Sequence, residues 1–107
     1  MANSRQIPMC RALIADLLPR CYPKVEQTAG LLGVPVRTLQ RRLKDHGQSY
    51  SELVEAIRSE RACRLLEEPQ MRVADVAKAL GYTDPSSFSR AFRRWTGISP
   101  RAYRRRC

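Results

Sequence analysis

Residues 36–47, VRTLQRRLKDHG, carry side chains that could read DNA. If this stretch is a helix with about 100° between successive residues, four polar side chains share one sector. They are Arg37, Gln40, Arg41 and Lys44. Leu39 and Leu43 lie on the opposite side. In the major groove, Arg can form two hydrogen bonds with guanine, and Gln can do so with adenine. The stretch indicates either an ordinary solvated helix face or a helix that reads base pairs.

A second basic stretch, PSSFSRAFRRWT at residues 85–96, has the same arrangement. Its corresponding sector holds four side chains, namely Ser86, Ser89, Arg90 and Arg93. Phe88, Phe92 and Trp95 turn to the other side, as residues of a core would. The two outward faces correspond position by position, and this correspondence favours a shared binding role over two unrelated solvated faces.

Both stretches belong to a longer internal repeat, VEQTAGLLGVPVRTLQRRL (25–43) and VADVAKALGYTDPSSFSRAF (73–92). Two pairs are offset by 48 residues, Ala29 with Ala77 and Gly33 with Gly81. The offset becomes 49 between Leu39 and Phe88, because the second turn is one residue longer. A small Ala lets two helices cross closely, and a Gly accepts a left-handed turn. Each copy therefore predicts a helix-turn-helix.

The remaining elements that position these stretches are also helical, because no strand-like alternation of apolar and polar residues occurs. We predict an all-α fold of about seven helices. Besides the stretch at 36–47, helices are expected at residues 8–18, 24–32, 49–67, 73–80 and 85–96. The helix at 49–67 is the longest. It begins with the capping box SYSE, in which the side chains of Ser49 and Glu52 would each accept from the other's backbone N–H.

Several residues mark the expected helix boundaries. Pro19 should stop the first helix, and Gly33 should end the second. Asp84 is the expected N-cap before Pro85, and Gly97 should end that helix. In the long helix, three arginines are expected to pair mainly with nearby glutamates rather than with DNA: Arg58, Arg61 and Arg64, beside Glu55, Glu60 and Glu67.

The composition points to a polyanionic partner. The chain has 107 residues, with 20 Lys and Arg against 10 Asp and Glu, a formal net charge of +10 and a pI near 10.3. Such a charge implies nucleic acid or, less often, an anionic membrane surface. No apolar run approaches the roughly 20 residues of a membrane span, so a soluble, cytoplasmic protein is expected. The final RRR at 104–106 is expected to attract phosphates from a disordered tail.

The sequence offers little for metal binding or catalysis. Its cysteines, at positions 10, 21, 63 and 107, form no CxxC pair, and His46 is the sole histidine. We expect reduced thiols, with Cys10 and Cys63 in cores, and neither a metal site nor a cofactor. No nucleophile with a base, paired carboxylates or phosphate-binding loop can be found, so an enzyme is not expected.

The segment at residues 73–104, VADVAKALGYTDPSSFSRAFRRWTGISPRAYR, resembles the DNA-binding domain of the AraC/XylS family of bacterial transcription regulators. The positions that match the signature of this family are Ala77, Leu80, Gly81, Tyr82, Ser87, Phe88, Arg90, Phe92, Gly97, Pro100 and Tyr103. RTLQRRL is similar to the first recognition helix of family members with a large sensor domain. The resemblance implies one domain over residues 1–107, with helix-turn-helix subdomains at 8–48 and 68–107 and a connector helix at 49–67.

The resemblance also implies a function and a set of roles. Double-stranded DNA would be bound in two successive major grooves to regulate transcription. The base-contacting residues would be Arg37, Gln40, Arg41, Ser86, Ser89 and Arg90. Contacts with the DNA backbone would come from Arg42, Lys44, Arg93 and Arg94. Two positions depart from the family pattern: Pro35 replaces a usual Ser cap, and Pro85 cannot donate a hydrogen bond. The second motif should therefore read sequence less strictly.

Further partners follow only from the resemblance, and alternatives stay open. RNA polymerase is an expected partner. A sensor and dimerisation domain would belong to the full-length protein, unless the chain is a stand-alone regulator. The alternative is a basic helical module that binds RNA or a membrane surface. Base stacking on RNA would need exposed aromatic residues, whereas the aromatic residues here fall at core positions. The paired turn glycines argue against a helix that lies on a membrane.

Overall fold

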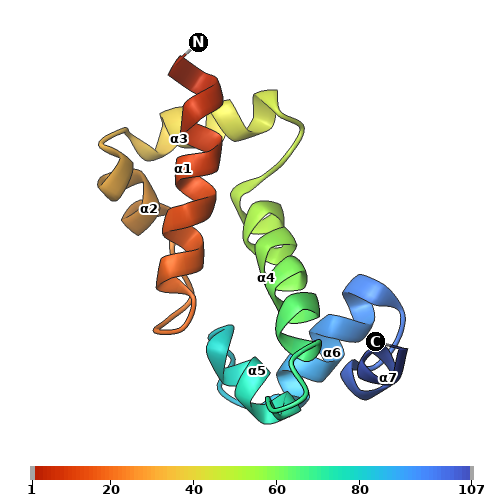
Figure 1. Ribbon diagram of the computed structural model, residues 1–107. Helices are drawn as coiled ribbons and strands as arrows, with labels where there is room; N and C mark the ends of the chain where they lie inside the picture. The colour runs from red at the N-terminus through yellow and green to blue at the C-terminus, as the bar shows by residue number, and fades with distance from the viewer. Residues whose placement is uncertain (1, 107) are drawn as a thin grey trace. The chain divides into compact units, whose positions relative to one another are not determined.

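The computed structural model describes residues 2–106, with side chains from residue 6 onward. Over this range the chain forms seven α-helices and no strand, which confirms the predicted all-α fold (Figure 1). The helices are α1 (Ala2–Leu17), α2 (Val25–Leu32), α3 (Val36–Asp45), α4 (Tyr50–Leu66), α5 (Val73–Ala79), α6 (Pro85–Thr96) and α7 (Pro100–Arg106). Not one helix of this range combines the length and the apolar character needed to cross a membrane.

The helices form two compact units, Met1–Ile57 and Arg58–Cys107, and each unit has its own core. The division falls within α4. The buried core of the first unit consists of Cys10, Ile14, Leu18, Ala29, Leu39, Leu43, Tyr50, Leu53, Val54 and Ile57. That of the second consists of Ala62, Leu66, Val76, Ala77, Leu80, Phe88 and Phe92. Complete burial of one such large apolar side chain is worth about 1.5–3 kcal/mol, and these residues hold α3 and α6 in their units.

The first helix begins earlier than predicted. We expected a start at residue 8, whereas α1 begins at Ala2 and contains Pro8. Pro8 removes only its own N–H donor from the helix, and its ring lies on the exposed side, where water can reach the affected backbone. The helix ends at Leu17, one residue short of the predicted limit, two residues before Pro19.

The prediction of a disordered basic tail was wrong. Residues 104–106 belong to α7, a helix that the sequence patterns did not define. Tyr103 packs on the second core, where its ring lies 5.6 Å from that of Phe92 in an edge-on arrangement. Arg104 donates from Nε to the Leu66 carbonyl (2.9 Å) and from Nη2 to the Glu68 carbonyl (3.3 Å). These bonds satisfy carbonyls at the end of α4, and they fix α7 in the second unit.

The internal repeat extends to the backbone hydrogen bonds of the turns. The Val34 N–H donates to the Ala29 carbonyl at 3.1 Å, and the Tyr82 N–H donates to the Ala77 carbonyl at 3.0 Å. Both turns contain a glycine with positive φ, 73° at position 33 and 86° at position 81. A residue with a side chain is strained in this conformation, so glycine permits both turns.

The repeat also includes a third helix, which the sequence comparison did not reveal. In the first unit, the Glu52 N–H donates to Ser49 Oγ at 3.1 Å, at the start of α4. In the second, the Ala102 N–H donates to Ser99 Oγ at the same distance, at the start of α7. Each of the helices α3 and α6 is therefore followed by a serine-capped helix, α4 after α3 and α7 after α6.

An arginine of α4 has an aromatic partner in the second unit. The side chain of Arg58 is only 8% exposed, and its guanidinium carbon lies 4.3 Å from the centroid of the Tyr82 ring. Tyr82 in turn stacks at a tilt on Phe88, with centroids 5.7 Å apart. A guanidinium over a ring face is attracted by the ring quadrupole. Arg58 thus packs on Tyr82 in the turn before α6. The expectation of ion pairs did not include this contact.

Candidate nucleic-acid interface

The outward face of α3 carries the polar side chains that the sequence placed there. Arg37, Gln40, Arg41 and Lys44 are all exposed. On the opposite side, Leu39 and Leu43 are completely buried in the first core. Because the core residues fix the rotation of the helix, the long side chains must point into solvent. They are free to meet a ligand as large as a nucleic acid.

The ends of α3 are stabilised by backbone geometry rather than by a side-chain cap at its start. Pro35 occupies the N-cap position in an extended conformation and makes no side-chain cap hydrogen bond. The Leu39 N–H donates to the Pro35 carbonyl at 3.1 Å, so the first backbone hydrogen bond of the helix forms at this departure from the family pattern. At the other end, Nδ1 of His46 lies 2.9 Å from the Arg42 carbonyl, at a helix terminus that favours positive charge.

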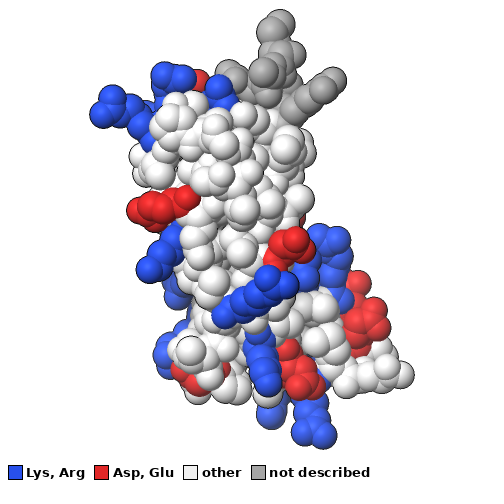
Figure 2. Space-filling view, turned by 90° about the vertical axis from the view of Figure 1, so that its left-hand side faces the viewer, with Lys and Arg blue, Asp and Glu red and all other residues white. Residues whose placement is uncertain are grey.

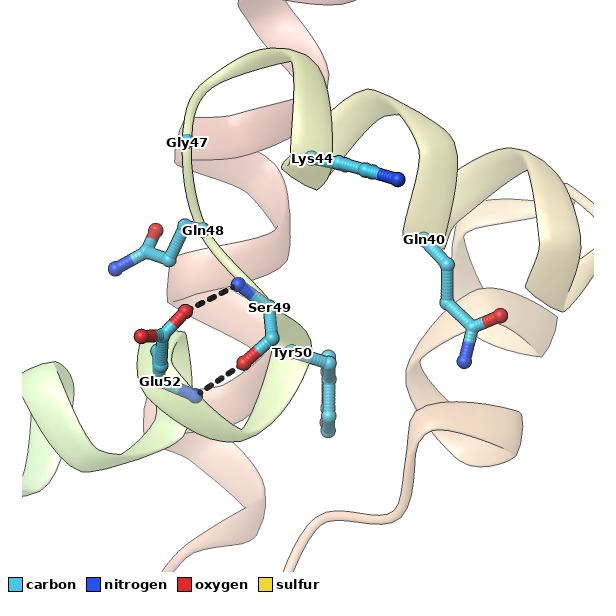
Figure 3. Close-up of a pocket in the computed structure, with 7 residues that line it drawn as sticks. All are labelled: Gln40, Lys44, Gly47, Gln48, Ser49, Tyr50 and Glu52. Carbon is cyan, nitrogen blue, oxygen red and sulfur yellow. Dashed lines mark hydrogen bonds between the residues drawn. The ribbon is translucent and has the colours of Figure 1, made fainter.

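A hollow of about 460 Å³ lies between α3 and the start of α4. Figure 3 shows Gln40 and Lys44 projecting from α3 on one side and the first residues of α4 on the other. The capping box holds the second side: the Ser49 N–H donates to Glu52 Oε1 at 2.8 Å, and the Glu52 N–H returns to Ser49 Oγ. This confirms the predicted capping box, and it fixes the edge of the hollow next to the outward face.

Tyr50 at the base of this region is part of the scaffold. Its hydroxyl donates to the Pro23 carbonyl at 2.6 Å and lies 2.8 Å from Thr28 Oγ1, which is fully buried. Burial is the main cause that raises the pKa of Tyr50 to about 12, and the hydrogen bond with Thr28 acts in the opposite direction. Since both partners lie inside the protein, the hydroxyl is committed to the fold and cannot also serve a phosphate.

The outward face of α6 is less basic than that of α3. Ser86, Arg90 and Arg93 are exposed, and Ser89 is half-buried. Phe88 and Phe92 are completely buried, as the equivalent leucines are in the first unit. The two short serine side chains reach less far from the helix than the Arg and Gln at the same positions of α3. This face consequently offers fewer donors at the distance of a base edge.

The start of α6 brings a carboxylate close to Arg90. Asp84 caps the helix as predicted, since its Oδ1 accepts from the Ser87 N–H at 2.8 Å and its Oδ2 from the Ser87 hydroxyl at 3.0 Å. The backbone bond, then the hydroxyl bond, and to a lesser extent the charge of Arg90 lower the pKa of Asp84. Arg90 donates from Nη2 to Ser87 Oγ at 3.4 Å. The capping cluster therefore orients Arg90, a link that sequence spacing alone did not suggest.

The four side chains predicted to contact the DNA backbone differ in availability. Lys44, Arg93 and Arg94 are exposed. Arg42 is half-buried, and its Nε and Nη1 atoms are buried without a hydrogen-bond partner among the described residues. Only the remaining nitrogen of Arg42 could reach a phosphate without a change in the side chain. On the face drawn in Figure 2, Lys and Arg side chains project into solvent with Asp and Glu between them.

The cysteines within the described range are free thiols. Cys10 is completely buried, and burial raises its pKa to about 11, while the charge of Arg11 opposes this shift. Cys63 is half-buried and packs on the second core, whereas Cys21 is exposed. Cys107 lies outside the described residues. A thiol with such a raised pKa is poorly nucleophilic at neutral pH, so Cys10 acts as a core residue.

Comparisons with known proteins bear on this geometry. The family model described as "Helix-turn-helix domain" matches residues 28–106. The HTH-type transcriptional regulator VqsM of Pseudomonas aeruginosa is 41% identical over 92 residues, which are 86% of this chain and 28% of that protein. The chain thus spans little more than a quarter of the length of this relative.

Two solved structures share the fold of this chain. The DNA-binding domain of AdpA, a global transcriptional factor solved in complex with a target DNA, is 31% identical with a TM-score of 0.77; the match covers 91% of this chain and 87% of that one. An AraC-type DNA-binding domain protein from Chromobacterium violaceum shares the fold at 24% identity, with a TM-score of 0.84 over 97% of this chain and 94% of the other. The sequence match and the paired helix-turn-helix units lead to one conclusion: the chain belongs to the AraC-type helix-turn-helix family of DNA-binding transcription regulators.

Proposed function

We propose that α3 and α6 each enter a major groove of the same double-stranded DNA. The observation that carries this proposal is the equivalence of their outward faces. Four positions on each helix correspond through the repeat, and the residues opposite to them are buried in two separate cores. The proposed base-contacting residues are Arg37, Gln40, Arg41, Ser86, Ser89 and Arg90. The proposed backbone-contacting residues are Arg42, Lys44, Arg93 and Arg94.

In this proposal α3 provides most of the sequence recognition. Arg and Gln side chains can form bidentate hydrogen bonds with guanine and adenine, and each good pair discriminates by about 1–3 kcal/mol. Among the proposed base-contacting residues of α6 only Arg90 has comparable reach, because the other two are short serines. Pro85, at the start of the helix, has no N–H to donate. The second unit would then tolerate more sequences in its groove.

We further propose that the DNA site has two boxes in the same orientation, about 10–10.5 base pairs apart, which is one helical turn. The support is α4, a single helix of 17 residues that contributes side chains to both cores. At 1.5 Å per residue it is roughly 25 Å long, a length compatible with neighbouring grooves once the width of the reading helices is added. A direct repeat is expected because one chain carries both readers.

Binding to a series of duplexes tests the two-groove proposal. The spacer between the boxes is lengthened by one base pair at a time, and a duplex with a single box serves as the control. Affinity should fall to that of the single box near five added base pairs, where the second box lies on the opposite face of the DNA. An unchanged affinity over this half turn would show that only one helix binds or that the two are flexibly tethered.

A salt titration separates DNA from the other classes of partner. For a duplex, log K should fall linearly with log salt, with a slope of about 0.9 for each phosphate contacted. Single-stranded RNA and anionic vesicles are the comparison ligands at equal charge. Duplex DNA should bind most tightly across the salt range. A flat profile for the duplex, or tighter binding to RNA or vesicles, would contradict the proposal.

For the whole protein, we propose a regulator in which this chain is the DNA-binding part, in the cytoplasm and without catalytic activity. The support is the share of the relatives that the chain covers, 28% of VqsM. The remainder would hold a sensor and dimerisation domain, and the assembled protein would contact RNA polymerase. Transcription in a reconstituted system tests the contact with RNA polymerase. Recovery of intact DNA from the same reaction tests the absence of catalytic activity on DNA.

A further inference from the structure

A basic hollow of about 700 Å³ lies in the second unit, next to α6. Its lining comes from the start of α5, the start of α6 and the helix α7. The lining residues are Arg72, Val73, Ala74, Pro85, Arg101, Arg104 and Arg105. The lining thus contains four arginines and, among the residues that the structure describes, no acidic side chain. Nothing assigned so far to the outward face of α6 uses these arginines.

The four arginines are not equivalent. Arg104 is half-buried, and its guanidinium is committed to the carbonyls of Leu66 and Glu68. Arg72, Arg101 and Arg105 are exposed, and each can turn its guanidinium toward a ligand. Two acidic residues directly adjoin lining residues in the sequence, and both accept hydrogen bonds from the backbone. Asp75 accepts from the backbone N–H of Arg72 at 3.1 Å, and Asp84 caps α6.

The first unit has an equivalent hollow with a different charge. It measures about 330 Å³, and four of its lining residues correspond through the repeat to residues of the basic hollow. The pairs are Lys24 with Arg72, Val25 with Val73, Glu26 with Ala74 and Ser51 with Arg101. In the first unit a lysine is balanced by a glutamate. In the second the same positions carry two arginines and no acid, so the helix-turn-helix scaffold by itself does not require this charge.

We propose that the basic hollow binds phosphodiester groups of the DNA strand that borders the groove entered by α6. The hollow adjoins the proposed reading face directly, since its lining residue Pro85 is followed by the exposed Ser86. Guanidinium groups bind phosphate oxygens through paired, charge-assisted hydrogen bonds. The apolar residues Val73 and Ala74 can accommodate the sugar carbons between two phosphates.

This inference rests on the proposed DNA binding, and it assigns different roles to the two units. The second unit would hold the duplex mainly through its backbone, with little dependence on sequence, while α3 reads the bases. Phosphate contacts position a protein on DNA and contribute most of its salt dependence. The basic hollow would thus compensate for the short serines on the outward face of α6.

The test uses a triple variant of the 107-residue chain, Arg72→Gln, Arg101→Gln and Arg105→Gln. Arg104 is kept because it holds α7 to the end of α4. A matched control removes three exposed charges that lie outside the three hollows and outside the outward faces of α3 and α6. Its substitutions are Arg20→Gln, Arg64→Gln and Lys78→Gln. Thermal unfolding by circular dichroism establishes that both variants are folded. If the triple variant unfolds, the single variant Arg105→Gln replaces it.

Affinity for one duplex is measured as a function of salt. The slope of log K against log salt should decrease by about 2–3 in the triple variant, at about 0.9 per lost phosphate contact, and by less than 1 in the control. The ratio of affinities for the preferred site and a random duplex should stay the same. Equal changes in the two variants, or a changed sequence preference at the second box, would overturn the proposal.

A second measurement locates the contact. Single phosphates beside the second box are replaced by neutral methylphosphonates, one position at a time. In the unmodified chain, two or three positions should weaken binding by about tenfold each. In the triple variant the same replacements should have almost no further effect. If both proteins lose the same factor at every position, the hollow does not hold these phosphates. Failure of the unmodified chain to prefer duplex DNA would instead overturn the proposed function itself.

Discussion

The two helix-turn-helix units have the same backbone plan and different surface chemistry. Their turns share a hydrogen bond from the residue after the glycine to the carbonyl of a buried alanine. Their reading helices bury apolar residues at equivalent positions, leucines in α3 and phenylalanines in α6. The outward positions differ: α3 presents long Arg, Gln and Lys side chains, whereas α6 presents two serines and two arginines. The backbone plan therefore depends on the buried positions, whereas the exposed positions can carry different side chains in the two units.

The same comparison applies to the surroundings of the reading helices. The first unit has a nearly balanced hollow beside α2, and the second has the basic hollow beside α5. The long side chains that we propose to contact bases thus lie in the unit with the weakly charged hollow, and the short ones lie in the unit with the basic hollow. This pairing suggests that affinity and sequence recognition are distributed unequally over the two units.

The largest expected effect concerns the separate cores. Phe92 contacts the rings of Phe88, Trp95 and Tyr103 in the second unit. Phe92→Ala should cost about 3–5 kcal/mol of unfolding free energy, and Leu43→Ala in the first unit about 2–5. Urea unfolding followed through Trp95, the only tryptophan, reports on the second unit. If the units unfold separately, Leu43→Ala will leave this transition nearly unchanged. A large shift from both variants would show that the two cores unfold as one.

The next effect concerns base recognition. Arg41→Ala should lower affinity for the preferred duplex by about 1–3 kcal/mol and relax the preference at one base pair. Ser86→Ala should do much less, because a short hydroxyl provides at most one weak contact. Binding to a panel of single-base variants of the site measures both. Equal losses, or a larger loss for Ser86→Ala, would mean that the second unit reads sequence as strongly as the first.

A third prediction concerns the buried hydrogen bonds of Tyr50 in the first unit. Tyr50→Phe removes the hydroxyl that serves Thr28 and Pro23, and the unsatisfied groups should cost about 1–3 kcal/mol. The repeat places buried Pro100 at this position of the second unit, without a hydroxyl. Tyr103→Phe is the control, since its hydroxyl bonds to the exposed Glu67 and to Cys63, which is only half-buried. A loss for Tyr50→Phe no larger than that of the control would mean that the buried network contributes little.

The same tyrosine gives a pH dependence. Its pKa is raised from 10.0 to about 12 in the folded protein. The folded state therefore holds this proton more tightly than the unfolded state, and stability is lost as pH rises from 10 toward 12. Chemical unfolding at several alkaline pH values should show a smaller loss in Tyr50→Phe than in the unmodified chain. An identical pH profile for both would contradict the assignment of the shift to Tyr50.

The smallest effect concerns the helix caps, which again differ between the units. Asp84 caps α6 through its carboxylate, whereas Pro35 offers α3 no side-chain acceptor. Because hydrogen bonds from Ser87 lower the pKa of Asp84, its contribution is present above the ordinary pKa of 3.8 and is lost as pH falls through the lowered value. Asp84→Asn retains an acceptor oxygen, so it should remain folded with a weaker acid dependence. Acid titrations of helicity, with and without the substitution, measure the contribution of the Asp84 cap to stability.

Most helices could be predicted because their signals are local. The capping box at Ser49, the Asp84 cap and the glycine turns are all written in a few neighbouring residues, and the structure confirms them. Two errors have local causes as well. The sequence pattern predicts a helix start at Pro8, although a proline on an exposed side can be tolerated inside a helix. The run of arginines predicts a disordered tail, although packing of Tyr103 on the core provides the stability that three arginines alone do not.

The candidate interface was predictable in part for the same reason. The outward faces of α3 and α6 follow from periodicity, since buried apolar residues fix which side turns away. The contact roles assigned to these faces stay predictions. The link from Asp84 through Ser87 to Arg90 was missed, because spacing shows that the residues are neighbours and does not show how their side chains are oriented.

By itself the sequence determined the helical periodicity, the repeat, the turns and the net positive charge, because each depends on neighbouring residues or on a sum over the chain. Only the tertiary structure decided which distant side chains meet. Arg72 and Arg101 are 29 positions apart, and they line one hollow only because α5, α6 and α7 pack around the second core. The commitment of Arg104 to the end of α4 was likewise decided by packing. Such long-range contacts depend on how complete helices fit together, a property that no short stretch of residues encodes.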